Sequence, residues 1–169
     1  FPRQELESGP LPQEVLVGDG KTKIEVGSFT SMSASGWVNL DVFDLDGFAQ
    51  ANGYQYKRCD ARMGLPFPTS SVHLIHSSHM LEHLNYRNGL ALLREFRRII
   101  RPDGALRISV PDAEELTRLY SEGGDQLAEF DEINIGCAAS PTSAGKLWAL
   151  LHEGHSSCYD WKTLKEALK

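Results

Sequence analysis

The chain has 169 residues, enough for one domain with a substantial core, and its apolar content of 41% is that of an ordinary globular protein. Its 17 basic and 23 acidic residues give a net charge of −6, which argues against a broad nucleic-acid surface. Three cysteines without a C-x-x-C pair predict free thiols in a reducing, cytoplasmic setting, and no apolar run is long enough to cross a membrane.

The first part of the chain predicts an arm and one strand. Residues 1–14 carry three prolines and mixed charges, which is typical of an arm laid over a surface. Residues 15–17 are apolar and form a candidate short strand. Residues 23–26 are the first candidate strand of a core, and they end in a turn that reads Glu25-Val26-Gly27-Ser28-Phe29.

Two further strands follow. Residues 37–41 form the second candidate strand, which ends on an acidic residue, Asp41, followed by Val42. A short helix is expected over residues 45–51, and helix capping accounts for Asp44 and Asp46 at its start. Residues 54–59 form the third strand, which Asp60 and Ala61 close.

Residues 66–112 have the parts of a β-α-β unit in order. A strand is expected over residues 72–77, a helix over 85–100, a turn at 101–104 and a strand over 105–110. Two strands joined by a long helix lie parallel with a right-handed crossover, and ligands bind at the carboxyl ends of such strands. Those ends carry Ser77-Ser78-His79 and Pro111-Asp112.

The remaining residues predict helices. Candidate helices cover residues 113–122, 125–133, 143–152 and 159–168, and Asp160 is a plausible N-cap of the last. The expected organisation is one domain over residues 1–169, with an arm (1–14), a core (15–112) and a helical region (113–169) on the substrate side.

The segments LPFP, SSVHLIHSSHMLEHL and LLREFRRIIRPDGALRISVPD resemble the second half of a class I S-adenosylmethionine-dependent methyltransferase, most closely the small methyltransferase type 11 group. The resemblance extends over residues 23–112. It implies an α/β, Rossmann-like, doubly wound and mostly parallel sheet flanked by helices, with S-adenosylmethionine as the cofactor.

The resemblance also implies the cofactor-binding residues. The acidic residue at the end of the second strand, Asp41, is expected to accept hydrogen bonds from the ribose hydroxyls. Phe29 stands where the family has the second glycine of an acidic-x-Gly-x-Gly turn, which is a departure from the pattern. The full implied set is Glu25, Gly27, Ser28, Phe29, Asp41, Val42, Asp60, Ala61, Ser78 and His79.

His79 and Asp112 are the candidate catalytic residues, because they lie at the ends of the fourth and fifth strands and can take a proton from an acceptor. A histidine titrates near neutral pH, which favours His79, and strand termination or helix capping is an equally good explanation of each residue. The expected acceptor is a small molecule or a glycan- or lipid-linked intermediate, with no nucleic acid and no membrane as partner. The alternative is a methyltransferase-like binding module without turnover, which the departure at Phe29 keeps open.

A zinc peptidase is the rival enzyme. His79-Met80-Leu81-Glu82-His83 matches the H-x-x-E-H pattern of inverted zinc peptidases, but it follows directly on a strand and lacks a clear third ligand. His152, His155 and Cys158 form a second cluster, with three ligands at a spacing too loose for a structural zinc. The family resemblance implies a role for His152 and His155 in shaping the substrate pocket. We therefore expect no metal.

No strand pattern follows residue 112, so we expect the sheet to lack the last strand pair of the family, with the chain shortened relative to it. The fifth strand would then be an edge with unpaired backbone groups. We expect residues 113–158 or a second chain in a homodimer to cover it.

Overall fold

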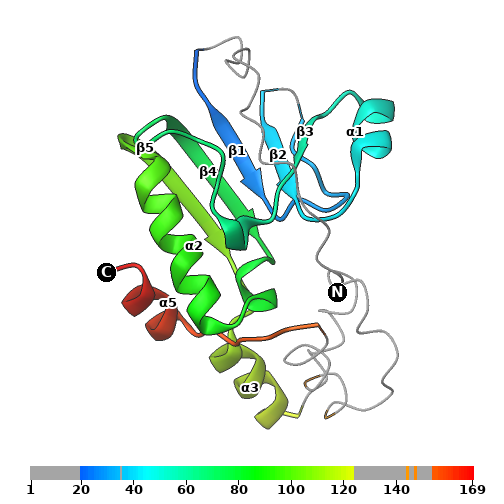
Figure 1. Cartoon of the computed structure of the whole chain (residues 1–169). Helices are drawn as coiled ribbons and strands as arrows, with labels where there is room; N and C mark the ends of the chain where they lie inside the picture. The colour runs from blue at the N-terminus through cyan, green and yellow to red at the C-terminus, as the bar shows by residue number, and fades with distance from the viewer. Residues whose placement is uncertain (1–19, 35, 124–143, 145–146, 148–153) are drawn as a thin grey trace. The chain divides into compact units, whose positions relative to one another are not determined.

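The computed structural model describes residues 20–34, 36–123, 144, 147 and 154–169. Its centre is a five-stranded, fully parallel sheet in the order β3-β2-β1-β4-β5 (Figure 1). The strands are β1 (Lys23–Val26), β2 (Val38–Asp41), β3 (Gln55–Arg58), β4 (Val72–Ser78) and β5 (Ile100–Ser109). The expected α/β, doubly wound architecture is confirmed.

Two compact units make up the chain. The sheet unit comprises Phe1–Met80 and Leu90–Ser109, and the C-terminal unit comprises Leu81–Gly89 and Val110–Lys169. All five strands belong to the sheet unit.

The strand order reverses between β1 and β4. From β1 the chain proceeds outward through β2 to β3, and it then returns to place β4 on the other side of β1, next to β5. Parallel sheets bind ligands where their order reverses, at the carboxyl ends of the strands. At this point of the sheet lie Gly27, which follows β1, and Met80, which follows β4; a Cβ built on Gly27 would lie 2.3 Å from Cγ of Met80.

The two faces of the sheet differ in polarity. The register pairs Ile24 of β1 with Val38 of β2 and Ile75 of β4, and all three are buried. The next position pairs Glu25 with Asn39 and with His76. Since side chains alternate between faces along a strand, one face is apolar and the other carries a polar row across three strands.

The loop between β1 and β2 supplies hydrogen-bond partners for the polar row. The backbone N–H of Ser33 in this loop donates to Oε2 of Glu25 at 2.9 Å and to Oδ1 of Asn39 at 2.8 Å. Asn39 Nδ2 donates back to the Ser33 carbonyl at 3.0 Å. The side chain of Asn39 is fully buried, so these hydrogen bonds satisfy it where water cannot.

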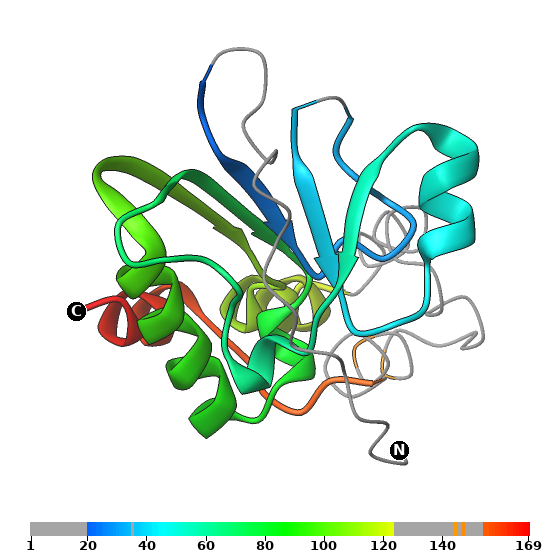
Figure 2. The same ribbon diagram turned by 45° about the horizontal axis from the view of Figure 1, so that its top comes forward.

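The helices of the sheet unit are α1 (Asp46–Asn52), beside β3, and most of α2 (Tyr86–Ile99), which runs alongside β4 and β5 in Figures 1 and 2. The sequence predicted both to within one residue at each end, and for α2 the basis was the helical period of its apolar residues. Buried apolar side chains of α2 recur at helical spacing, as an amphipathic helix requires. They are Leu92, Leu93, Phe96 and Ile99.

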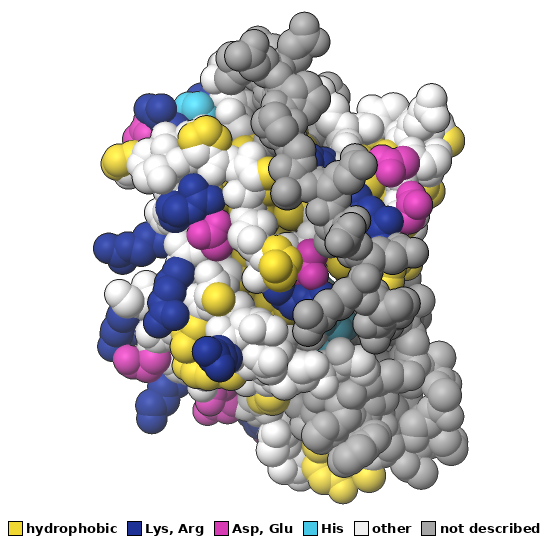
Figure 3. Space-filling model, viewed as in Figure 1, with side chains coloured by type: hydrophobic (Ala, Val, Ile, Leu, Met, Phe, Trp, Pro, Cys, Tyr) yellow, Lys and Arg dark blue, Asp and Glu magenta, His cyan; other side chains and the backbone are white. Residues whose placement is uncertain are grey.

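The outer side of α2 carries both basic and acidic side chains (Figure 3). Figure 3 shows basic side chains gathered on the side where α2 lies, with acidic side chains among them. Arg98 pairs with Glu95 at 2.8 Å, and Arg101 pairs with Asp103 at 2.9 Å. Paired charges of both signs are typical of a solvated surface and not of a phosphate-binding patch.

The start of β5 differs from expectation. The strand begins at Ile100, directly after α2, and not at residue 105. Ile100 pairs with Val72 and Ala105 with Leu74, so residues 101–104 form a bulge within the β4–β5 pair. The predicted turn is present, but pairing with β4 on both sides of it makes it part of the strand.

The C-terminal unit contains η2 (Leu81–His83), the first turn of α2, α3 (Ala113–Ser121) and α5 (Trp161–Ala167). An isolated parallel bridge joins Asp112 to Tyr159, ahead of α3 and α5 respectively. Asp160 is the N-cap of α5, as predicted, and accepts from the Thr163 amide at 2.6 Å.

Several expected elements lie outside the described residues: the arm at 1–14, the strand at 15–17, the helix at 125–133 and most of the helix at 143–152. Within the described residues, no strand follows β5. None of the described helices has the length and apolar character needed to span a bilayer.

Candidate cofactor-binding and active site

The turn after β1 has the backbone geometry of a glycine turn. Gly27 has a φ of +79° and donates its N–H to the Leu40 carbonyl at 2.9 Å. A side chain at this position would be strained by the positive φ and would also collide with Met80. Packing against Met80 therefore explains a glycine at this position, and its contact with a cofactor stays a prediction.

Phe29 has a backbone conformation that favours glycine. Its φ is +42°, in the left-handed region that a bulky residue rarely adopts. Its side chain is 51% exposed, and its ring contacts that of Phe43 edge to face at a centroid distance of 5.6 Å. The aromatic side chain thus lies at the surface, next to the turn.

The Glu25 carboxylate interacts with other groups of the protein. Its side chain is buried; Oε2 accepts from the Ser33 amide, and Oε1 lies 3.5 Å from Nδ1 of His76. A buried carboxylate that binds a loop amide fixes the path of that loop. Glu25 therefore organises the segment around the turn, whatever its contact with a cofactor.

Asp41 lies at the end of β2, as predicted, and its carboxylate joins two loops. Oδ2 accepts from the Phe29 N–H at 2.8 Å and Oδ1 from the Phe43 N–H at 3.2 Å. The carboxylate is buried, yet each oxygen has a second lone pair for a ligand hydroxyl. Val42, the next residue, is 39% exposed.

The capping interpretation of the rival acids is wrong. The N-cap of α1 is Leu45, which makes no side-chain cap hydrogen bond, and Asp46 is the first helical residue. Asp46 fits there because an acidic side chain is favourable at a helix N-terminus. Asp44 is exposed.

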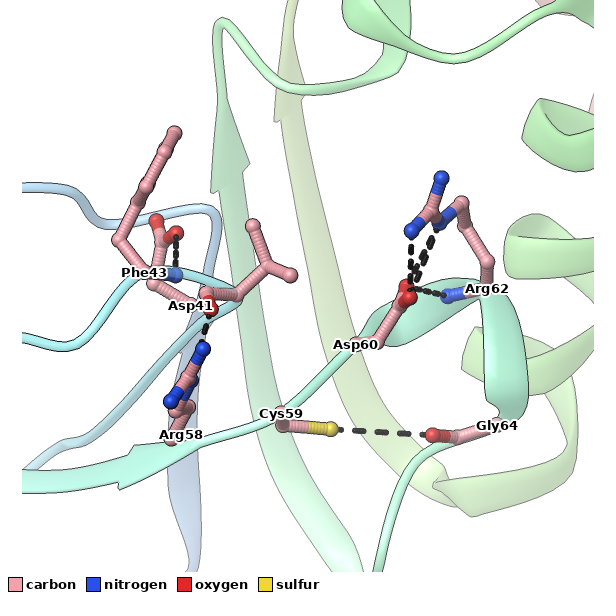
Figure 4. Close-up of polar contacts among 8 residues, drawn as sticks. Asp41, Phe43, Arg58, Cys59, Asp60, Arg62 and Gly64 are labelled. Atoms are coloured by element: carbon pink, nitrogen blue, oxygen red, sulfur yellow. Dashed lines mark hydrogen bonds and ion pairs between the residues drawn. The ribbon is translucent and has the colours of Figure 1, made fainter. Parts of the chain in front are cut away.

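Asp60 and Ala61 follow β3. Asp60 is the N-cap of η1 (Ala61–Met63) and binds the Arg62 guanidinium at 2.6 Å (Figure 4). The hydrogen bonds from Arg62 hold the pKa of the Asp60 carboxyl below its usual range, so it is an anion at neutral pH. Ala61 is buried. Asp60 therefore has a structural role in capping and ion pairing, and its contact with an adenine stays a prediction.

Ser78 and His79 end β4. His79 has a φ of +51°, its side chain is exposed, and its N–H donates to the Ser109 carbonyl at 3.0 Å. A non-glycine residue held in the left-handed region at the carboxyl edge of a sheet is typical of a functional position. The role of His79 as a proton acceptor stays a prediction.

Asp112 lies in the C-terminal unit, where it is the N-cap of α3. Its Oδ1 accepts from the amides of Glu114 and Glu115 at 3.0 and 3.4 Å. Capping alone accounts for an aspartate at this position.

The H-x-x-E-H pattern does not form a single helix. Ser78 still belongs to β4, His79 has a positive φ, and only Leu81–His83 form a turn of 3₁₀ helix. The zinc peptidase requires both histidines on one face of one α-helix, so its geometry is missing. Of the second cluster, His152 lies outside the described residues, whereas His155 and Cys158 lie in the C-terminal unit.

Sequence reasoning missed two residues that shape the site. Ser33 joins Glu25 to Asn39 through its backbone, and the Tyr56 hydroxyl lies 2.5 Å from the Phe43 carbonyl and 3.1 Å from that of Asp41. Tyr56 is one strand away, and only the register of β2 with β3 brings it there. A backbone contact such as that of Ser33 leaves no signal in residue type.

Comparison with known proteins agrees with this geometry. Residues 25–169 match the sequence model of a family described as a methyltransferase domain. The chain belongs to this family. The cofactor of class I methyltransferases is S-adenosylmethionine. No protein of curated function matches the sequence of this methyltransferase domain.

Solved structures share the fold. A SAM-dependent methyltransferase of Thermotoga maritima superposes with a TM-score of 0.57 at 14% identity, over 94% of this chain and 62% of that protein. A SAM-dependent methyltransferase of Archaeoglobus fulgidus superposes with a TM-score of 0.57 at 15% identity, over 88% of this chain and 58% of that protein. The methyltransferase domain described here thus spans less than two thirds of the length of these two proteins.

The residues present fit the cofactor of the family. The Ser28 hydroxyl is buried in the turn after β1 and has no hydrogen-bond partner among the described residues. Buried hydroxyls are normally paired, so a bound ligand is the expected partner. Ser28 and the remaining lone pairs of Asp41 together offer polar groups at the ends of neighbouring strands.

Proposed function

We propose that this chain binds S-adenosylmethionine at the carboxyl ends of β1, β2 and β3 and transfers its methyl group to a small-molecule acceptor. The observation that carries the proposal is Asp41, a buried carboxylate at the end of β2 that two loop amides hold in place. A carboxylate so fixed suits two vicinal ribose hydroxyls.

The remaining binding residues are assigned by position. Gly27 and Ser28 face the methionine part, because they form the turn directly after β1. Val42 and Ala61 flank the adenine with apolar surface. The rings of Phe29 and Phe43, 51% and 49% exposed, add aromatic surface beside Asp41.

When bound, S-adenosylmethionine supplies an electrophilic methyl group. The chain's own share is to orient the acceptor and to exclude water, because the displacement needs in-line geometry more than covalent help. An acceptor hydroxyl must also lose a proton, and the exposed imidazole of His79 can take it at Nδ1 or Nε2. Asp112 is the second candidate base.

Calorimetric titration with S-adenosylhomocysteine tests the cofactor claim. We expect one site per chain with a micromolar dissociation constant, and the absence of heat at millimolar ligand would overturn the proposal. Turnover is then measured as S-adenosylhomocysteine released with hydroxylated small molecules, including sugars and lipid-linked glycans. The negative net charge of −6 supports such acceptors over nucleic acid.

The two candidate bases are separated by substitution. His79→Gln should lower kcat by about 10²- to 10⁴-fold while cofactor affinity is retained, as for loss of a general base. Asp112→Asn keeps an N-cap of similar strength and removes only the charge. If Asp112 only caps α3, this variant keeps full activity.

A binding module without turnover is the second candidate, and Phe29 is the feature that favours it. The positive φ of Phe29 lies in the region that glycine favours, which supports the enzyme, whereas its bulky side chain supports the module. Cofactor binding without methyl transfer to any acceptor would favour the module.

The homodimer also remains a proposal. Among the described strands, β5 has a neighbour on one side only. Light scattering distinguishes a dimer from a monomer in which residues 113–158 cover this edge. A monomer whose β5 amides exchange rapidly with solvent would contradict both ways of covering the edge.

A further inference from the structure

Three metal-ligating side chains form a cluster in the C-terminal unit. One donor atom each of Glu82, His83 and His155 lies within 4.8 Å of the other two. The two imidazole rings meet edge to face, with centroids 4.9 Å apart. The Glu82 side chain is 1% exposed, His155 is half-buried and His83 is exposed.

Backbone hydrogen bonds hold the two segments of the cluster together. The amides of Ser156 and Ser157 both donate to the Glu82 carbonyl, at 2.7 and 3.0 Å. The Ser157 hydroxyl donates to the Leu81 carbonyl at 3.3 Å. Residues more than 70 positions apart in the sequence are thereby fixed against one another, which pre-organises the three side chains.

The hydrogen bond of His83 determines which of its nitrogens can bind a ligand. Nδ1 lies 3.0 Å from the Gly154 carbonyl oxygen. A carbonyl only accepts, so Nδ1 carries the proton and Nε2 has the free lone pair. Histidines that bind metals commonly donate their other N–H to a backbone carbonyl in this way. The φ of +76° at Gly154 favours glycine there.

We propose that Glu82, His83 and His155 bind a divalent transition-metal ion, of which zinc is the best fit. Two imidazoles and one carboxylate are the donor set of catalytic zinc sites, which keep a coordination position open for water or substrate. Donor atoms around a tetrahedral zinc are about 3.3 Å apart, given zinc–ligand distances of about 2.0 Å. The widest donor pair, within 4.8 Å, would therefore have to close by about 1.5 Å on binding.

The surroundings suit an ion of charge +2. A carboxylate as deeply buried as that of Glu82 is stabilised by positive charge nearby, which an ion would add. His83 is exposed, so an ion can reach the site from solvent.

The proposed site differs from the zinc peptidase pattern in its ligands. The peptidase would use His79 with His83, whereas here His155 takes the place of His79 and Glu82 is a ligand and not a general base. It also differs from the cluster of His152, His155 and Cys158, since it needs no thiol.

Metal titration of the full chain tests the proposal. Tag-free protein is dialysed against EDTA and then against chelator-free buffer, and zinc is added in a calorimeter without S-adenosylmethionine. Cobalt added in parallel reports coordination through its visible absorption bands. We expect one ion per chain, and a loss of affinity of at least tenfold in each of Glu82→Gln, His83→Ala and His155→Ala.

Two matched variants serve as controls. His79→Ala and Cys158→Ser should bind zinc as the wild type does, and circular dichroism of the metal-free variants checks their folding. If Glu82→Gln does not fold, the two histidine variants decide the outcome. No binding to the wild type, unchanged binding in His83→Ala and His155→Ala, or loss of binding in either control would overturn the proposal.

Discussion

The backbone N–H of Phe29 donates a hydrogen bond of 2.8 Å to Oδ2 of Asp41. This contact ties the turn after β1 to the end of β2, across two neighbouring parallel strands. It holds the carboxylate in one orientation before any ligand arrives, so that little order has to be gained on binding. We therefore expect a change in the backbone at Phe29 to affect the orientation of the Asp41 carboxylate.

Asp41→Ala should weaken S-adenosylhomocysteine binding by about 1.5–3 kcal/mol, the range for hydrogen bonds to a charged group. In dissociation constants this is a factor of about 10 to 150. Calorimetry on the purified variant measures it. Thermal denaturation is needed alongside, because the amides of Phe29 and Phe43 lose their acceptor and the fold loses stability.

Asp44→Ala is the matched control for charge, since Asp44 is an exposed acid near Asp41. It should bind the ligand as the wild type does. Equal loss in both variants would mean that the acidic character of the segment, and not the fixed carboxylate, governs binding.

At position 29, glycine should be more stable than alanine. The left-handed φ of +42° costs a residue with a Cβ roughly 1 kcal/mol, which glycine does not incur. Phe29→Gly and Phe29→Ala both lose the ring contact with Phe43, so their difference isolates the backbone. Urea denaturation of the two variants gives the two free energies of unfolding.

Val42 provides the comparison, because it is similarly exposed and is not among the described residues with positive φ. There the ordinary order should hold, with Val42→Ala more stable than Val42→Gly. The same order at both positions would show that Phe29 does not adopt the left-handed conformation in solution.

Arg98→Ala should destabilise the fold by about 1–2 kcal/mol, less than the full value for charged hydrogen bonds because the side chain is partly exposed. Its guanidinium donates to the carbonyls of Leu65 and Phe67 at 3.1 and 2.9 Å, and Glu95 accepts from the Leu65 amide at 3.1 Å. The pair thus holds the loop that leads into β4. Urea denaturation measures the loss.

Arg101→Ala is the matched control. It removes a comparable ion pair with Asp103, in which both side chains are exposed, and should change the free energy of unfolding by less than about 0.5 kcal/mol.

The effect of Arg98→Ala on stability should also depend on pH. Hydrogen bonds from Arg98 lower the pKa of Glu95 from its ordinary value of 4.5. A lowered carboxyl pKa stabilises the fold above the ordinary value, and that contribution is lost as pH falls through the folded-state pKa. The difference between wild type and Arg98→Ala should therefore shrink in acid.

Cys158 should react with iodoacetamide faster than Cys59. Burial, together with the negative charge of Asp60, raises the pKa of the Cys59 thiol to about 11, so at pH 8 about one thiol in a thousand is ionised. Cys158 is exposed, although partial burial also raises its pKa. Peptide mass spectrometry over time gives both rates. Labelling of Cys59 as fast as Cys158 would contradict the burial of Cys59.

Much of the fold could be predicted from the sequence because its signals are local. Alternating polarity predicted the strand at 105–110, which is part of β5; the helical period predicted α2, and an aspartate predicted the cap of α5. Each is determined by residues within a few positions. The position of Asp41 at the end of β2 followed from the same local pattern, and the family resemblance supplied its expected role.

Only the tertiary structure decided what depends on strand pairing and on contacts between distant segments. Residues 101–104 read as a turn, and pairing with β4 on both sides makes them a bulge in β5. The polar row of Glu25, Asn39 and His76 exists only in the register of three strands. The cluster of Glu82, His83 and His155 joins positions more than 70 residues apart, and no periodicity or spacing within one segment encodes such a contact.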